Sequence, residues 1–295
     1  MIDHLLALDP GRRGIASFFV KRGAAAAARS LLRARRVLIT TGFTVGDGLP
    51  ETDRPPGTAG LGHALRQLDK EVSYVTDKPV VPLLAAALRA LGEPAPIVTF
   101  PMTGDATATA RRILAEQAPS HLVSIERPGR TVGGDYLSAR GETVRPWNAP
   151  IDALFLGTPR RITTVGVGDG GNEIGMGNVR PRIARAGPLA RRIASVVKVS
   201  HLVVAGTSNW GAYGIVAELS ALAGRSLLHS ADEERKMVQA CVDAGAVDGL
   251  TRRAEPTVDG LPLEAHVGML ELLRLFAVPK SAARLTAPTT GGRSR

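Results

Sequence analysis

Short, nearly continuous apolar runs alternate along the chain with longer runs rich in Ala, Leu and Arg. The short runs, such as HLVSIER and RITTVGVG, are rich in β-branched residues, which is typical of strands buried on both faces of a parallel sheet. The longer runs predict helices. We therefore predict strands at residues 35–41, 71–77, 96–100, 121–127, 161–168 and 201–206. The predicted helices are 15–34, 57–69, 80–92, 105–118, 182–197, 211–223, 231–244 and 263–277.

Repeated strand–helix–strand units predict an α/β fold with a mostly parallel sheet, helices on both of its faces and a site at the carboxyl ends of the strands. We expect a single α/β catalytic domain over residues 1–280 and a disordered basic tail over 281–295. Segment 128–158 holds three Pro and five Gly, which indicates a lid or a small insertion. Local chemistry predicts helix caps at Asp105, Asp232, Gly92 and Gly224.

The net charge of +10 is concentrated at the two ends of the chain. Residues 1–40 hold eight Lys or Arg against two Asp, and residues 276–295 hold four and no acid, so the body between them is neutral. A nucleic-acid-binding protein carries its basic residues on a folded face, usually with aromatic residues among them. We therefore expect solvated basic termini and no nucleic-acid partner.

The remaining composition narrows the class of protein further. One cysteine, Cys241, excludes an internal disulfide and a Cys-rich zinc site, and we expect it in the core of a helical layer. No apolar run approaches the roughly 20 residues of a membrane span, and the first residues lack the pattern of a secretory signal. We expect a cytoplasmic protein without a membrane partner that acts on a small molecule and forms a homo-oligomer.

Acids, amides and glycines gather where the predicted strands end. The first strand runs into GFTVGDGLPETDRPPG, the fourth into Glu126 and Arg127, and the fifth into GVGDGGNEIGMGN. The sixth runs into TSNWGAYG, while AGAVDG and EPTVDGLPLE follow later. Carboxyl ends of parallel strands meet at one edge of a sheet, so these residues are expected to line one cleft.

The stretch GVGDGGNEIGMGN, residues 166–178, satisfies the G-x-G-x-x-G pattern of dinucleotide-binding loops. However, the pattern needs a helix directly after the turn and an acid about 20 residues further on, and neither is predicted here. Asp169 and Glu173 would also repel a phosphate. We expect no nucleotide cofactor. Two ligands remain open: a divalent cation, Mg²⁺ or Mn²⁺, held by carboxylates, and the ammonium group of an amino acid.

Taken together, six segments resemble the D-glutamate cyclase family, including its bacterial members. The segments, in the order of the family, are VLITTGFTVGDGLPETDRPPG, SIERPGR, TVGVGDGGNEIGMGNV, HLVVAGTSNWGAYG, AGAVDGLT and EPTVDGLPLEAH. They span residues 37–266. The chain departs from the family pattern at Arg54, where a glycine is expected, and in the loosened segment 133–141.

The resemblance implies a lyase that interconverts D-glutamate and 5-oxo-D-proline plus water without ATP. Ring closure needs a base for the ammonium, a group that neutralises the γ-carboxylate and an acid for the departing oxygen. The expected catalytic residues are Asp169, Glu173 and Glu126. The expected substrate-binding residues are Gly42, Arg127, Gly168, Gly170, Gly171, Asn172, Asn209 and Asp248. Should a metal bind, its ligands are expected among Glu51, Asp53, Asp169 and Glu173.

For such a lyase, Arg127 is expected to hold a substrate carboxylate in a two-pronged grip. Asn172 and Asn209 would orient the substrate, and the glycines would let it approach the backbone. Two other functions fit the same residues. One is a hydrolase that depends on Mg²⁺ or Mn²⁺, such as a phosphatase, and the other is a non-catalytic protein that binds an amino acid or another metabolite.

Overall fold

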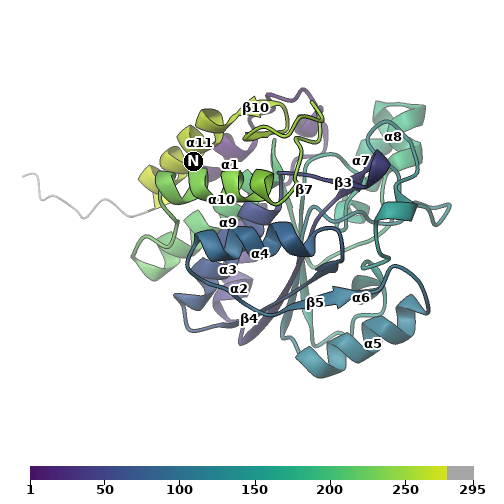
Figure 1. Ribbon diagram of the computed structural model, residues 1–295, viewed down its shortest axis with the longest axis horizontal. Helices are drawn as coiled ribbons and strands as arrows, with labels where there is room; N and C mark the ends of the chain where they lie inside the picture. Colours follow the sequence, from purple (N-terminus) through teal and green to yellow (C-terminus); the bar gives the residue numbers. More distant parts are fainter. Residues whose placement is uncertain (278–295) are drawn as a thin grey trace, which may run out of the picture.

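The computed structural model describes residues 1–277, which form six parallel strands and the helices around them (Figure 1). The strands form one sheet in the order β5-β4-β1-β6-β7-β8. Their bounds are β1 (Arg36–Thr41), β4 (Glu71–Asp77), β5 (Ile97–Phe100), β6 (His121–Ile125), β7 (Thr163–Gly168) and β8 (His201–Val204). All six predicted strands and the α/β fold are confirmed.

The strand order reverses between β1 and β6 at the centre of the sheet. From β1 the chain moves outward to β4 and β5, then returns to the other side of β1 and continues to β6, β7 and β8. Thr41 at the end of β1 is paired with Ile125 at the end of β6, so the loops after these strands start side by side. Loops that diverge from such a reversal leave a crevice, which is where open α/β sheets bind ligands.

Alternating side chains of each strand are buried in two separate layers. Val37 and Ile39 of β1 pack in the larger core, whereas Leu38 packs on the opposite face with Ile113 and Leu154. Figure 1 shows the helices of the larger core on one side of the sheet. They are α1 (Ile2–Leu6), α2 (Gly23–Leu32), α3 (Pro55–Arg66), α4 (Val81–Ala90), α9 (Ser208–Ala223), α10 (Ala231–Asp243) and α11 (Leu263–Ala277). The other face carries α5 (Ala106–Gln117) and α6 (Ala153–Leu156).

Two predicted helices differ from the structure. The helix expected at 182–197 is wrong, because Gly187 has a φ of 134° and Pro188 lacks an N–H group. The chain instead forms α7 (Arg180–Ile183), a 3-10 turn at Ala184–Ala186 and α8 (Pro188–Ile193). The helix expected from residue 15 begins at Gly23, and Ile15–Ser17 forms a separate 3-10 turn.

Most of the predicted caps are confirmed. The Asp105 side chain accepts hydrogen bonds from the backbone N–H groups of Thr107 and Ala108 at the start of α5. Gly92 and Gly224 both adopt positive φ directly after helices. The cap predicted at Asp232 is wrong. Ser230, two residues earlier, caps α10 and forms a reciprocal capping box with Glu233, whereas Asp232 lies inside the helix and pairs with Arg235.

Two short hairpins were not predicted, and both lie in loops at the carboxyl edge of the sheet. They are β2 (Thr44–Val45) with β3 (Leu49–Pro50), and β9 (Thr257–Val258) with β10 (Leu261–Pro262). Strands of two residues are too short to show an alternating pattern. The hairpins nevertheless matter, because Glu51 directly follows the first and Asp259 lies in the turn of the second.

Of the remaining sequence predictions, the structure confirms the one for Cys241 and leaves several untested. Cys241 is fully buried in the larger core, as predicted. None of the helices formed by residues 1–277 has the length and hydropathy of a transmembrane helix. The tail predicted at 281–295 lies outside the described residues. A cytoplasmic location, a homo-oligomer, the absence of a nucleic-acid partner and the single domain over 1–280 stay predictions.

Candidate functional site

A cavity of about 670 Å³ opens at the carboxyl edge of the sheet. Its lining comes from loops that follow β1, β6 and β7, together with the N-terminal loop before α2 and the β9–β10 turn. Three of the charged residues that line it, Arg140, Glu142 and Arg252, are exposed, and the other seven form its floor: Arg13, Glu51, Arg54, Glu126, Asp169, Glu173 and Asp259. The predicted gathering of acids at the strand ends is therefore present in the structure, with two arginines among them.

Arg54 joins two of these acids across the central crevice. Its Nη2 donates a hydrogen bond of 2.5 Å to Oε1 of Glu126, and its Nη1 pairs with Glu51. The guanidinium also lies over the ring of Phe43, 5.2 Å from its centroid. All three charged side chains are nearly fully buried. The loop after β1 is thus tied to the first residue after β6.

These surroundings shift the pKa values of the two glutamates in opposite directions. Burial raises the pKa of Glu51 to about 7, because desolvation outweighs the attraction of Arg54. Burial also acts to raise the pKa of Glu126, but Arg54 and Arg13 together lower it below its usual value. Glu126 is therefore a carboxylate at neutral pH, whereas Glu51 exchanges its proton near pH 7.

Three charged residues of the floor have positive φ, a conformation that non-glycine residues rarely adopt. The values are 87° at Arg54, 45° at Glu126 and 55° at Asp259. Such conformations cluster at functional sites, where the surrounding structure enforces them. At Arg54 the enforcing residue is Asn209, whose Oδ1 accepts hydrogen bonds from the backbone N–H groups of Arg54 and Gly57 at 3.0 and 2.8 Å.

Arg13 connects the N-terminal loop with two further acids. It pairs with Asp169 after β7, and its Nη2 lies 2.5 Å from Oδ1 of Asp259. Its loop is shaped by Asp9, whose carboxylate accepts hydrogen bonds from three backbone N–H groups, those of Arg13, Gly14 and Ile15. Because the Arg13 side chain is only 25% exposed, the expectation of a solvated N-terminus is wrong for this residue.

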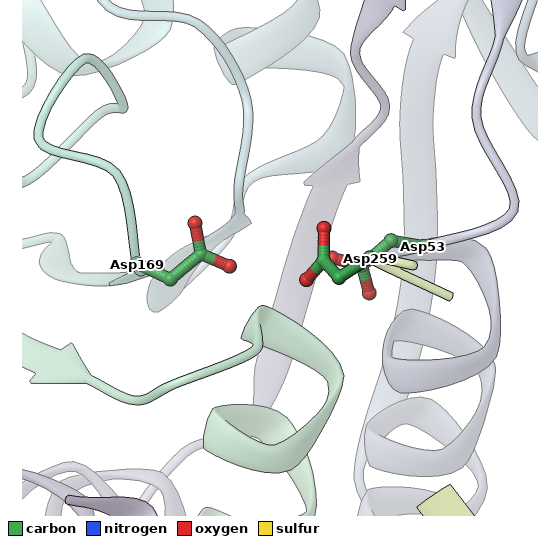
Figure 2. A group of neighbouring side chains, drawn as sticks. All are labelled: Asp53, Asp169 and Asp259. Atoms are coloured by element: carbon green, nitrogen blue, oxygen red, sulfur yellow. The ribbon is translucent and has the colours of Figure 1, made fainter. Parts of the chain in front are cut away.

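Asp53, Asp169 and Asp259 form a group of acids whose nearest oxygens all lie within 4.8 Å of one another. Figure 2 shows the carboxylate of Asp169 turned toward those of Asp53 and Asp259. One oxygen of Asp53 and one of Asp259 are buried without a hydrogen-bond partner. Burial and the neighbouring negative charges raise the pKa of Asp53. A divalent cation fits this donor set, but it would compete with Arg13 for Asp169 and Asp259.

In a second group of acids, Glu126, Asp169 and Glu173, the nearest carboxylate oxygens also lie within 4.8 Å of one another. Glu173, however, already accepts hydrogen bonds from the backbone N–H groups of Gly170 and Gly171 at 2.6 and 2.7 Å. These are the N–H groups that a phosphate would need in a dinucleotide loop. Burial and Glu126 raise the pKa of Glu173, and the backbone donors oppose the rise. The Glu173 carboxylate therefore occupies the position in this turn that an external anion would take.

Four of the predicted substrate ligands belong to the loop around Glu173, and two of them line the cavity. Asn172 lines the cavity, and its Nδ2 donates to the carbonyl oxygen of Leu137 in segment 128–158. Gly170 lines the cavity as well, and a Cβ on it would lie 2.9 Å from Oε1 of Glu173. Gly168 and Gly171 lie behind this surface, where glycine lets Glu173 and Ile183 pack closely.

Six of the eight predicted substrate ligands lie outside the cavity lining: Gly168 and Gly171, Asn209 behind Arg54, and Gly42, Arg127 and Asp248. Arg127 is fully buried, where it pairs with Asp77 and donates to the carbonyl oxygens of Gly42 and Ala149. Its Nη groups are thus used within the fold, and Gly42 serves it as an acceptor. Asp248 accepts hydrogen bonds from three backbone N–H groups of its own and a neighbouring loop, those of Leu250, Thr251 and Gly260. These placements favour structural roles.

Two floor residues, Arg13 and Asp259, were missing from the predicted site. Both are distant in sequence from the loops after the strands, and only tertiary packing brings them to Asp169. Arg54 stands out in the sequence only as a departure from the family pattern. An arginine in place of the expected glycine, within a segment that otherwise matches, is the one signal in the sequence that marks it.

Comparisons with known proteins agree with the resemblance of the six segments. The family described as "D-glutamate cyclase-like, C-terminal" matches residues 2–274. The human protein "D-glutamate cyclase, mitochondrial" is 33% identical over 313 aligned residues, which cover 92% of this chain and 50% of the human protein. The chain thus spans about half the length of this curated relative.

Similar solved structures share little sequence with the chain. An exopolyphosphatase-related protein from Bacteroides fragilis is 9% identical, with a TM-score of 0.45 over 88% of this chain and 58% of its own. RecJ from Thermus thermophilus, in complex with Mn²⁺, is 12% identical, with a TM-score of 0.36 over 96% of this chain and 37% of its own. The family match and the human relative are decisive: this chain belongs to the D-glutamate cyclase-like, C-terminal family.

Proposed function

We propose that the chain is a lyase that interconverts D-glutamate with 5-oxo-D-proline and water without ATP. The observation that carries this proposal is the floor of the cavity, where five buried or nearly buried carboxyl groups surround two guanidinium groups. An excess of acids in a desolvated site favours a cationic ligand, such as the ammonium group of an amino acid. The family relationship supports D-glutamate as this amino acid.

Ring closure joins the α-nitrogen of glutamate to its own γ-carboxyl carbon. A new C–N bond forms, a C–O bond breaks, and the departing oxygen leaves as water. Because both reacting groups belong to one molecule, a site that folds the substrate supplies much of the rate enhancement. Starting from the ammonium and the γ-carboxylate, the protein must still help to move two protons from the nitrogen to the departing oxygen.

Glu126 suits the binding of the ammonium, and Glu51 suits the proton transfer. Glu126 is ionised at neutral pH and one of its oxygens is buried without a partner, so it can receive the ammonium. With a pKa of about 7, Glu51 can take up a proton and release it again at neutral pH. We assign the binding of the ammonium to Glu126 and the proton transfer to Glu51.

The arginines neutralise the substrate's negative charge. Arg54 lies between the two glutamates, where it can stabilise the oxyanion that develops as the γ-carboxyl group is attacked. Arg13 is partly exposed at the cavity and can reach the α-carboxylate from the other side. Asp169 positions Arg13, because its second carboxylate oxygen accepts hydrogen bonds from the backbone N–H and hydroxyl of Ser208. Glu173 shapes the loop that carries Asp169.

A hydrolase that uses Mg²⁺ or Mn²⁺ is the second candidate, and the group Asp53, Asp169 and Asp259 favours it. These residues would hold the ion, which when bound would polarise a substrate oxygen and supply an activated water. The competing guanidinium of Arg13 is the reason that we rank this function second.

The decisive experiment incubates the protein with D- and L-glutamate, with and without EDTA, and measures 5-oxoproline by chiral chromatography. We expect 5-oxo-D-proline from D-glutamate in both conditions, and its loss in Glu126→Gln. A matched control is Glu116→Gln, which changes an exposed glutamate on α5.

Three results would contradict the proposal. Phosphate release from a phosphoester that EDTA abolishes would establish the hydrolase instead. A melting shift with D-glutamate but no turnover would indicate a binding protein. Normal turnover in Glu126→Gln would remove the assigned role of Glu126.

A further inference from the structure

The cavity is larger than free glutamate requires. Its volume of about 670 Å³ lies within the ~300–1,000 Å³ range of sites for drug-sized ligands, whereas glutamate has about ten non-hydrogen atoms. The charged floor accounts for only part of the lining. The rest of the cavity lies beside apolar side chains.

These side chains form an apolar wall, and part of it is open to solvent. It is formed by α7, the following 3-10 turn and α8, with Ile183, Leu189 and Ile193 facing the cavity. Leu189 is 47% exposed, and Leu250, which also lines the cavity, is 57% exposed. Large apolar side chains in a concave site are stabilised when a ligand covers them. Free glutamate has no apolar group beyond its short methylene chain to place there.

The apolar wall begins next to the acidic loop. A Cβ on Gly171 would lie 3.2 Å from the side chain of Ile183, and Gly171 is two residues from Asp169. A substrate whose amino group meets the acidic floor can therefore extend directly onto the wall. The extension starts at the γ-carboxyl group, because the α-nitrogen must stay free to attack and the α-carboxylate is assigned to Arg13.

The negative charge of the floor also favours a substrate that is modified at its γ-carboxyl group. The floor already holds Glu51, Glu126, Asp169, Glu173 and Asp259 against two arginines, so a free γ-carboxylate adds a further anion to an acidic site. A γ-amide is neutral, and its carbonyl carbon is a better electrophile than that of a carboxylate. The same acids would still bind the ammonium group.

We propose that the chain also cyclises γ-glutamyl amides whose amine part is apolar, an inference that rests on the proposed ring closure at this site. The α-nitrogen forms a bond to the γ-carbonyl carbon, and the bond from that carbon to the amide nitrogen breaks. Starting from the ammonium form, two protons leave the α-nitrogen and two are gained by the departing nitrogen, which therefore leaves as a protonated amine. The products are 5-oxoproline and the free amine, with no water consumed or released and no change in oxidation state.

Arg140 extends this assignment to amides of apolar amino acids. It is exposed and lines the cavity in segment 128–158, as does the exposed Glu142, with which it forms no ion pair. The segment lies against α8, because a Cβ on Gly141 would lie 2.9 Å from Leu189. A γ-glutamyl amino acid can thus place its side chain on Leu189 and its terminal carboxylate near Arg140.

The test compares γ-D-glutamyl-leucine, γ-D-glutamylglycine and D-glutamate as substrates of the full chain, with the L-glutamyl forms in parallel. We expect 5-oxoproline and leucine in equal amounts, with kcat/KM for the leucine amide about tenfold or more above that for the glycine amide. Leu189→Ser, and separately Leu250→Ser, should lower this ratio. The control is Leu222→Ser on α9, a similarly exposed leucine outside the cavity lining, which should keep the ratio unchanged.

Each other result is informative. If D-glutamate is cyclised but neither amide is, or if leucine and glycine amides react equally well, this inference is wrong and the proposed function stands. If the amides yield glutamate in place of 5-oxoproline, the site hydrolyses them and the inference is also wrong. If no substrate yields 5-oxoproline, the proposed function fails and this inference fails with it.

Discussion

Arg54 donates a 2.5 Å hydrogen bond to Glu126, and both residues hold a backbone conformation with positive φ. The contact spans the reversal point of the sheet, because Arg54 ends the loop after β1 and Glu126 is the first residue after β6. Two unfavourable conformations thus meet in one buried ion pair. This pair lies at the centre of the site, where the loops after the two central strands diverge.

Removal of the Arg54 charge should reduce both stability and turnover. Arg54→Gln leaves Glu51 and Glu126 buried without their guanidinium partner, which should destabilise the fold by about 3–5 kcal/mol. The pKa values of both glutamates should rise, so the rise of kcat/KM with pH should shift to higher pH. Denaturant unfolding and a pH–rate profile measure these effects. An unchanged profile in the folded variant would contradict the assigned role of Arg54.

Glu51 should determine the pH dependence of ring closure. Because its carboxylate form accepts the proton, the rate of 5-oxoproline formation should rise with pH and level off above its pKa of about 7. Glu51→Gln should reduce kcat by about 10²–10⁴-fold and remove this inflection. A variant that keeps an inflection near pH 7 would show that another group transfers the proton.

The raised pKa of Glu51 should also make the free energy of unfolding depend on pH. The folded state binds the Glu51 proton more tightly than the unfolded state, so the free energy of unfolding should fall as pH rises from about 4.5 to 7. For Glu51 alone the loss is about 3 kcal/mol at most. Melting temperatures of wild type and Glu51→Gln between pH 4.5 and 8 test this, and the wild type should decline more steeply. Parallel curves would mean that the folded and unfolded pKa values of Glu51 are alike.

Arg13 should weaken the binding of divalent cations. Its guanidinium occupies Asp169 and Asp259, two of the three acids that could hold Mn²⁺. Arg13→Gln should therefore tighten Mn²⁺ binding by about tenfold or more, a difference of about 1.4 kcal/mol. Electron paramagnetic resonance of free Mn²⁺ measures this without an activity assay. The matched control is Arg12→Gln, an exposed neighbour outside the cavity lining. Equal affinity in all three proteins would show that Arg13 does not compete for the acids.

Arg127 should matter for stability and not for substrate affinity. Arg127→Gln leaves Asp77 buried without its charge partner, which should destabilise the fold by about 3–5 kcal/mol. The KM for D-glutamate of the folded variant should stay close to that of wild type. A large rise in KM with unchanged stability would instead support the carboxylate-binding role predicted from the sequence.

The sequence by itself determined the sheet and the edge at which the acids gather. Continuous apolar runs such as HLVSI can be buried only in the middle of a layered α/β fold, so six strands and their order along the chain followed from local pattern. Glu51, Glu126, Asp169 and Glu173 followed from their positions after strands, and all four line the cavity.

Only the tertiary structure decided how these residues divide their roles. Arg127 and Asp248 also follow strands or lie in polar loops, yet their hydrogen bonds are used inside the fold. Arg13 and Asp259 lie 246 residues apart and meet at Asp169. The pattern along a chain reports which face of an element is buried, but hydrogen-bond partners between distant loops depend on packing that no local pattern contains. The acids of GVGDGGNEIGMGN can therefore be read from the sequence. That the Glu173 carboxylate accepts hydrogen bonds from the N–H groups of its own turn is a property of the fold alone.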